Sequence, residues 1–277
     1  MRNHELRIAD HELKELVKKA LREDIGTGDI TSKLVIAEKL KATAVIKAKE
    51  PGVIAGLEVA AEVFRQVDRR IKLTKKIRDG EKIARGQALA TVSGPARGIL
   101  TGERTALNFL QHLSGIATLT ARFVSRAGRA TVLDTRKTVP GMRALEKYAV
   151  KTGGGTNHRM GLYDAVLIKD NHIKLAGGIR EAVARAKGKK VEVETKDLAE
   201  VREAIDAGAS RILLDNMDTG TMKKAVKLCR AAEIKTEASG GVDLKNISTI
   251  ARTGVDYISI GALTHSSKAL DINLKIF

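Results

Sequence analysis

Cysteine, aromatic residues and long apolar runs are scarce in this sequence, and each shortage excludes a class of protein. Cys229 is the single cysteine among 277 residues, so an internal disulfide framework and a zinc cluster built on cysteines are excluded. Its setting, KLCRAAEIK, is typical of a buried helix position and not of a nucleophile. No apolar run reaches about 18 residues, so no transmembrane helix is predicted.

The first residues, MRNHELRIADHELKEL, are charged and lack the apolar centre of a signal peptide. A hydrophobic content of 43% is enough for a real core. We therefore expect a cytoplasmic protein without a membrane partner.

Charge is abundant and mostly positive. Lys and Arg number 50 and Asp and Glu 33, so the net charge is +17. Such a balance suggests polyanionic partners. The charge is spread along the chain, however, and four Phe, three Tyr and no Trp leave few rings to stack on bases. Nucleic acid is thus an alternative partner that we do not expect, and a thermophile surface explains the same composition.

From about residue 131, short apolar runs alternate with helical stretches. The runs cover 131–134, 165–169, 191–194, 212–215, 234–239 and 257–261. Strands that alternate with helices pair in parallel through right-handed crossovers, and a repeat of about 20–25 residues suits a compact α/β barrel. Two of the intervening helices have readable ends, because Asp197 and Asp243 are placed as N-caps and Gly208 and Gly254 as terminators.

Residues 1–107 have a different pattern. HELKELVKKALREDIG (11–26) predicts an amphipathic helix, and KATAVIKAKEPGVIAGLEVAAEVFRQV predicts a strand, a turn at Pro51 and Gly52, and a helix. The segment IRDGEKIARGQALATVSGPARGIL alternates as antiparallel strands do. Residues 103–126 predict a long helix, or two, leading into the barrel. The first part is therefore a small α+β domain.

The residues that follow the barrel strands are the candidate site, because a barrel carries its site at the carboxyl ends of its strands. These residues are basic, acidic or small, and none of the strand ends is apolar: Asp134, Thr135, Arg136, Lys137, Lys169, Glu194, Asp215, Ser239, Gly240, Gly241, Gly261 and Ala262. Most strand ends thus carry chemistry suited to phosphate, a metal ion or a carboxylate.

This set predicts an anionic ligand. Arginine suits planar carboxylates and phosphate, and Arg136 and Arg159 would converge with the lysines at the same edge. Glu194 and Asp215 end neighbouring strands, where two carboxylates could hold Mg²⁺ on a diphosphate. The turns SGG and GAL offer backbone N–H groups, with a following helix N-terminus, to a phosphate.

Each feature also has a simpler interpretation. A lysine that ends a strand is often a solvated surface residue. Asp215 could cap the helix expected around 219–228, and the glycine triplet at 153–155 could be only an open loop. His265 is as compatible with the surface as with a ligand contact. The coincidence of these residues at one edge favours the functional interpretation.

Several motifs together resemble one enzyme family. They are EDIGTGDITS (23–32), GERTALNFLQHLSGIAT (102–118), DTRKTVPGMRALEKYAV (134–150), GGGTNHRMGLYDAVLIKDNHI (153–173), VEVE (191–194), ILLDNM (212–217), EASGGV (237–242) and SIGALTHS (259–266). The chain resembles the quinolinate phosphoribosyltransferases, the decarboxylating enzymes of de novo NAD synthesis, over nearly its whole length. A related phosphoribosyltransferase acting on another base is the nearest alternative.

The resemblance implies a fold, an assembly and a reaction. It implies an α/β fold with an N-terminal α/β sandwich over 1–107, onto which 267–277 pack back, and an incomplete α/β barrel over 108–266. It also implies a homo-oligomer, dimer or hexamer, in which one subunit's sandwich closes the other's barrel. The pyridine nitrogen of quinolinate attacks the anomeric carbon of phosphoribosyl pyrophosphate, and carbon dioxide is then lost to give nicotinate mononucleotide.

The resemblance further implies residue roles. Quinolinate would be bound by Arg104 of the neighbouring subunit and by Arg136, His158 and Arg159. Lys137 and Lys169 would neutralise pyrophosphate or phosphate. Glu194 and Asp215 would bind Mg²⁺ or contact the ribose, and they are expected to act in catalysis together with Lys137. The remaining contacts, to the 5-phosphate, would come from Ser239, Gly240, Gly241, Ile260, Gly261, Ala262 and His265; Thr135 is also expected at the substrate.

Overall fold

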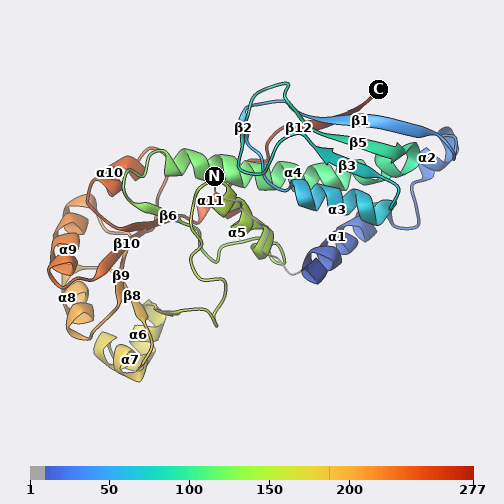
Figure 1. The fold of residues 1–277 in the computed structure, drawn as a ribbon. Helices are drawn as coiled ribbons and strands as arrows, with labels where there is room; N and C mark the ends of the chain where they lie inside the picture. The colour runs from blue at the N-terminus through green and yellow to red at the C-terminus, as the bar shows by residue number, and fades with distance from the viewer. Residues whose placement is uncertain (1–9, 187) are drawn as a thin grey trace. The chain divides into compact units, whose positions relative to one another are not determined.

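The computed structural model describes residues 10–186 and 188–277, and this part of the chain forms two compact units (Figure 1). The first unit contains 10–121, Pro140–Gly154 and Ser267–Phe277. The second contains Arg122–Val139 and Gly155–Ser266. The chain therefore leaves the first unit and returns to it twice.

The first unit combines an antiparallel sheet with helices. Its helices are α1 (Asp10–Ile25), α2 (Ile30–Val35), α3 (Leu57–Val67), most of α4 (Ala96–Val124) and α5 (Arg143–Thr152). Its strands are β1 (Lys41–Ala48), β2 (Gly52–Val53), β3 (Lys72–Lys75), β4 (Lys82–Ile83), β5 (Ala88–Pro95) and β12 (Ile272–Ile276). The four-stranded sheet has the order β12-β1-β5-β3, and β2 pairs with β4. The predicted amphipathic helix and the predicted β1 and α3 are confirmed.

One layer of helices covers this sheet (Figure 1). In β1, Ala44, Ile46 and Ala48 alternate with more exposed residues and are at most 1% exposed, as a strand with one buried face requires. Phe64 of α3 and Leu110 of α4 are also at most 1% exposed. The last strand, β12, pairs antiparallel with β1, so the C-terminal residues complete this sheet.

The second unit is a parallel sheet with helical crossovers. Its strands are β6 (Thr131–Leu133), β7 (Val166–Ile168), β8 (Val191–Thr195), β9 (Arg211–Asp215), β10 (Lys235–Ser239) and β11 (Tyr257–Ser259). Its helices are α6 (Asp170–Ala176), α7 (Ile179–Arg185), α8 (Leu198–Asp206), α9 (Thr219–Ala231), α10 (Ile247–Ala251) and α11 (Ala262–His265). The strand order is β6-β11-β10-β9-β8-β7, with β6 and β7 at the two edges. The six predicted strands and the incomplete α/β barrel are thus confirmed.

The two faces of this sheet differ in polarity. On the outer face, Val193, Ile212 and Leu214 are fully buried, and α8, α9 and α10 lie on that side (Figure 1). On the inner face, Glu192 and Glu194 alternate with the valines of β8, because successive strand side chains point to opposite faces. The helices are therefore held by apolar contacts, and the inner face carries charged side chains beside the apolar Leu213.

The helix ends show which acidic residues serve as caps. Asp197 caps α8, accepting a hydrogen bond from the Glu200 amide at 2.9 Å, as predicted. Asp243 makes the capping hydrogen bond predicted for it, accepting the Asn246 amide at 2.9 Å, but the first turn is not α-helical and α10 itself begins at Ile247. Asp218 caps α9, so Asp215 is not the cap of this helix.

The close approach of α4 to the C-terminal segment gives a stability prediction. A Cβ at Gly115 would lie 2.2 Å from the Lys268 carbonyl oxygen, which is backbone and cannot turn away. We expect Gly115→Ala to lower the free energy of unfolding by about 1–3 kcal/mol through overpacking. At an exposed helix position the same change would raise it by about 1 kcal/mol. Denaturant unfolding checks the sign, and stabilisation would contradict the packing described.

Candidate active site

The carboxyl ends of the six parallel strands lie at one edge of the barrel sheet. Among the predicted site residues, Arg104 alone belongs to the first unit; the others lie at this edge or in the loop before β7. We call this the carboxyl edge. The fold therefore brings together the residues that we predicted as a site because each of them follows a strand.

The loops after β6 and β11 meet at this edge. A Cβ at Gly261 would lie 3.0 Å from Cδ of Lys137 and 3.0 Å from Nε2 of His265, so these two side chains flank the glycine. The Thr264 hydroxyl donates to the Lys137 carbonyl at 2.6 Å, which ties the two loops together. The Thr135 hydroxyl accepts the Lys137 amide at 3.0 Å. Lys137 is therefore exposed, and it lies beside Gly261, which has no side chain to fill the space.

The neighbouring strands β8 and β9 carry the two candidate carboxylates. Lys169 Nζ, from the end of β7, lies 3.3 Å from Glu194 Oε2. Asp215 Oδ2 accepts a hydrogen bond from Asn216 Nδ2 at 2.8 Å. Both carboxylates are partly exposed, and in the parallel register Thr195 lies opposite Leu214. Hard oxygen ligands in such a setting fit Mg²⁺ that keeps waters or substrate oxygens as its other ligands.

The glycine turn after β10 requires its glycines. Gly240 has φ +92°, and a Cβ there would lie 2.2 Å from Asn216 Oδ1. Gly241 has φ +58°, a left-handed conformation that costs little only for glycine. α11 begins at Ala262, directly after β11, whereas the SGG turn does not lead into a helix until Ile247. The expectation of a helix N-terminus after each glycine turn therefore holds only for the second.

The cations of the loop before β7 are held by the protein itself. Arg159 is 8% exposed and donates from Nη1 to the Ala165 carbonyl at 3.2 Å. Burial, together with the charge of Arg136, lowers the pKa of Arg159. Two guanidinium groups close enough to repel each other, one of them buried, favour a negatively charged ligand between or beside them.

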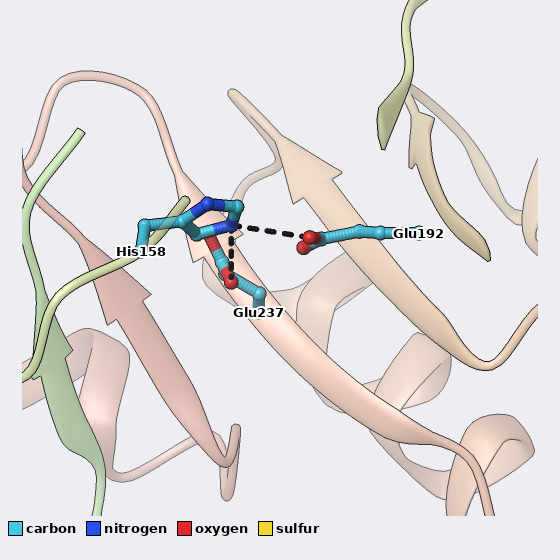
Figure 2. Close-up of side chains that lie close together, drawn as sticks. All are labelled: His158, Glu192 and Glu237. Atoms are coloured by element: carbon cyan, nitrogen blue, oxygen red, sulfur yellow. Dashed lines mark hydrogen bonds and ion pairs between the residues drawn. The ribbon is translucent and has the colours of Figure 1, made fainter. Parts of the chain in front are cut away.

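His158 lies below this edge, in the barrel interior (Figure 2). Its Nε2 lies 3.1 Å from Glu192 Oε2 and 3.5 Å from Glu237 Oε2, and its Nδ1 accepts the Arg159 amide at 2.8 Å. Burial opposes protonation of the ring, but the two carboxylates outweigh it and raise the pKa of His158 to about 9. A doubly protonated ring would have to give up the Arg159 amide, whereas Nε2 carries a hydrogen in either state.

Glu192 and Glu237 were missed as candidates from the sequence. Burial raises the pKa of Glu192; burial acts in the same direction on Glu237, but His158 outweighs it and lowers the pKa of Glu237. The available signal was the period of two in VEVE and in TEAS, which places each glutamate on the same face as the residue that ends its strand.

His158, Glu192 and Glu237 have the composition of a three-ligand metal site, but their geometry does not suit one. A ring whose Nδ1 accepts a hydrogen bond carries its hydrogen on Nε2, so Nε2 has no lone pair for a metal ion. Arg211 Nη1 also lies 3.2 Å from Glu237 Oε2, where it already supplies a positive charge. The group is better described as a buried ion-pair network.

Arg104 is exposed on α4, in the first unit. The alternative interpretation was a surface pair with Glu103 or another acid. Among the residues that the structure describes, no acidic side chain forms an ion pair with Arg104. Burial raises the pKa of its neighbour Glu103, and the charge of Arg104 opposes this. Arg104 therefore remains available to a ligand.

The fold and the carboxyl edge define an α/β-barrel protein built to bind anions. Comparison with known proteins shows the family. Residues 29–114 match the N-terminal domain of quinolinate phosphoribosyl transferase, and residues 116–275 match its C-terminal domain. The chain belongs to the quinolinate phosphoribosyltransferase family.

Individual relatives agree with this assignment. The chain is 46% identical to the mitochondrial decarboxylating quinolinate phosphoribosyltransferase 2b of Nicotiana tabacum, over 96% of this chain and 82% of that protein. It is 45% identical to the chloroplastic nicotinate-nucleotide pyrophosphorylase of Arabidopsis thaliana, over 96% and 83%. The solved nicotinate-nucleotide pyrophosphorylase of Francisella tularensis superposes with a TM-score of 0.94 at 43% identity, over 98% of both chains.

Within the described residues, none of the helices combines the length and the apolar character that crossing a membrane requires. The prediction of a cytoplasmic location is not tested by these comparisons and stays a prediction.

Proposed function

We propose that this chain transfers the phosphoribosyl group of phosphoribosyl pyrophosphate to the ring nitrogen of quinolinate, with loss of the 2-carboxylate as carbon dioxide. The observation that carries the proposal is the carboxyl edge, where Arg136, Arg159 and the lysines face two carboxylates and two glycine turns, in a chain of this family. The products are nicotinate mononucleotide and pyrophosphate, in NAD biosynthesis.

Quinolinate is a dianion, and the site offers matching charge. Arg159 has a buried, desolvated guanidinium near Arg136, and both would be stabilised by the two carboxylates of the substrate. His158 stays a predicted contact, since both of its ring nitrogens are engaged by the protein in this structure. The cationic edge favours quinolinate over a base with a single carboxylate.

The phosphates of the second substrate suit the other side of the edge. Lys137 lies beside Gly261, and the backbone N–H groups of Gly240, Gly241, Gly261 and Ala262 would serve the 5-phosphate. The predicted contact from the Ile260 backbone does not fit, because its N–H donates to the Leu133 carbonyl at 2.9 Å. Thr135 lies in the same loop as Lys137, and His265 is the last residue of α11, which follows the second glycine turn. Glu194 and Asp215 would hold Mg²⁺, which when bound neutralises the charge of the leaving pyrophosphate.

The reaction needs positioning and charge more than a chemical group from the protein. The nitrogen lone pair of quinolinate forms the bond to the anomeric carbon as the bond to pyrophosphate breaks. The ring nitrogen then carries a positive charge. When the bond to the 2-carboxylate breaks, its electron pair remains at C2, where that charge stabilises it, and a proton replaces the carbon dioxide. Lys137 and its neighbouring cations supply the electrostatic stabilisation.

The direct test is the balance of the reaction. The protein, quinolinate labelled in its 2-carboxyl group, phosphoribosyl pyrophosphate and Mg²⁺ are expected to give labelled carbon dioxide, pyrophosphate and nicotinate mononucleotide in equal amounts. Nicotinate in place of quinolinate is expected to give no product. Product from nicotinate alone would identify a related phosphoribosyltransferase, and salt-sensitive retention of RNA or DNA without turnover would favour the nucleic-acid alternative.

The two carboxylates at the ends of β8 and β9 give a metal prediction. We expect Glu194→Gln and Asp215→Asn each to lower kcat/KM for phosphoribosyl pyrophosphate by roughly 100-fold, the scale of one lost electrostatic contact at the reacting centre. Quinolinate affinity, measured by calorimetry, should change much less. Asp256→Asn, which removes a carboxylate at the opposite edge of the same sheet, is the matched control. Unchanged pyrophosphate release in both variants would remove the metal assignment.

The role of Arg104 is tested by subunit mixing. If Arg104 completes the quinolinate site of a neighbouring subunit, Arg104→Ala and Lys137→Ala should each be nearly inactive alone. Unfolded together and refolded, they should regain activity, because one pocket of each mixed dimer contains neither defect while the other contains both. Each variant refolded with itself is the control. Proven subunit exchange without recovered activity would exclude a contribution from the neighbouring subunit.

A further inference from the structure

Five side chains form a continuous polar group inside the barrel, below the carboxyl edge, which we call the interior cluster. They come from four strands and one loop: His158, Glu192, Arg211, Glu237 and Tyr257. Figure 2 shows three of them, with the imidazole of His158 between the carboxylates of Glu192 and Glu237. The proposed reaction does not require any of the four strand residues to touch a substrate.

The contacts of the cluster run in sequence from Tyr257 to His158, which is a predicted quinolinate contact. Tyr257 presents its ring to the Arg211 guanidinium, with 4.2 Å between Cζ and the ring centroid. Arg211 Nη1 lies 3.2 Å from Glu237 Oε2 and 3.9 Å from Glu192 Oε2. Both carboxylates face Nε2 of His158. Each member thus fixes the position of the next.

His158 passes this constraint to Arg159 through the backbone. The His158 amide donates to Asp134 Oδ1 at 2.8 Å, which anchors the main chain. The Arg159 amide donates to Nδ1 of the same histidine at 2.8 Å, which ties the next peptide to the orientation of the ring. Nε2 carries a hydrogen in either protonation state, so the carboxylates hold the ring in both. The contact of Nδ1 with the Arg159 amide belongs to the singly protonated ring, whereas the anchor of the His158 amide on Asp134 does not depend on the ring's protonation.

The arrangement of the interior cluster is not the one that would give the most stable fold. Oε1 of Glu192 and Oε1 of Glu237 are buried and accept no hydrogen bond from the described residues. Buried ion pairs of this kind are often no more stabilising than apolar residues of the same size. Buried polar atoms left without partners are uncommon and call for an explanation, which function at the site above can supply.

We propose that Glu237 and Arg211 are positioning residues for quinolinate: they hold Glu192 and His158 in place, and His158 in turn fixes the peptide from which Arg159 reaches the substrate carboxylate. The inference rests on the proposed function, in which Arg159 binds quinolinate. The proposed roles do not require Glu237 or Arg211 to contact a substrate. Their effect is therefore expected on one substrate only and to depend on Arg159.

The experiment measures quinolinate and phosphoribosyl pyrophosphate binding separately by calorimetry, on the full chain. Glu237→Gln is expected to weaken quinolinate binding by about 10- to 100-fold, the effect of losing an outer partner of a site residue, and to change phosphoribosyl pyrophosphate binding by less than about threefold. Thermal unfolding checks that the variant is folded. Arg211→Lys keeps the charge but loses the planar contact with Tyr257, and it provides a milder variant of the same kind.

The matched control is Glu62→Gln. Glu62 is also a buried carboxylate, 8% exposed and bound to Arg65 at 2.6 Å, but it lies on α3 in the first unit. Its loss should leave quinolinate binding unchanged. If it weakens quinolinate binding as much as Glu237→Gln does, the effect is a general loss of stability and the proposal is wrong.

A double-mutant cycle with Arg159→Ala separates the possible outcomes. Because Glu237 is proposed to act on Arg159 by way of His158, Glu237→Gln should weaken quinolinate binding much less once Arg159 is absent. Additive losses, equal losses for both substrates, or unchanged quinolinate binding in folded Glu237→Gln and Arg211→Lys would overturn the proposal. Intact quinolinate binding in Arg159→Ala alone would instead overturn the role of Arg159 in the proposed function.

Discussion

The barrel unit depends on the pairing of charges that its sheet buries. Glu192 and Glu237 are at most 8% exposed, and an unpaired carboxylate at such a depth costs several kcal/mol. His158 Nε2 provides a hydrogen-bond donor to Glu192 at 3.1 Å, and Arg211 provides a positive charge to Glu237 at 3.2 Å. The outer face of the same strands is apolar and holds the helices. One sheet thereby provides a stable outer layer and a charged interior that supports a site for anions.

The site gains its character from where the strands end. Parallel strands place their following loops at one edge, and these loops contribute polar residues or a glycine turn. Gly240 and Gly261 have no side chains where Asn216, Lys137 and His265 lie close, so backbone and cations can both approach a phosphate. A dianion and a phosphorylated sugar can then be bound together without a covalent step, which is consistent with catalysis by positioning and electrostatics.

Much of this organisation could be predicted from the sequence, and the limits have physical causes. The six barrel strands and the cap at Asp197 followed from local patterns, since short apolar runs and capping residues act within a few residues. The capping contact expected at Asp243 is present, but the α-helix starts at Ile247, because the same carboxylate also accepts the Lys245 amide in a turn. Glu192 and Glu237 were missed because the sequence around a glutamate inside a strand does not show which side chain it will pair with. Their pairing with His158 joins residues far apart in the sequence, and only the tertiary structure brings them together.

A crystal structure of the protein with quinolinate bound tests this account most directly. The account predicts the two carboxylates against the guanidinium groups of Arg136 and Arg159 at the carboxyl edge, with His158 Nε2 still hydrogen-bonded to Glu192. Quinolinate bound away from this edge would contradict the proposed function. Quinolinate bound at the edge to a His158 ring that has turned away from Glu192 would leave the function standing and contradict the role given to the interior cluster.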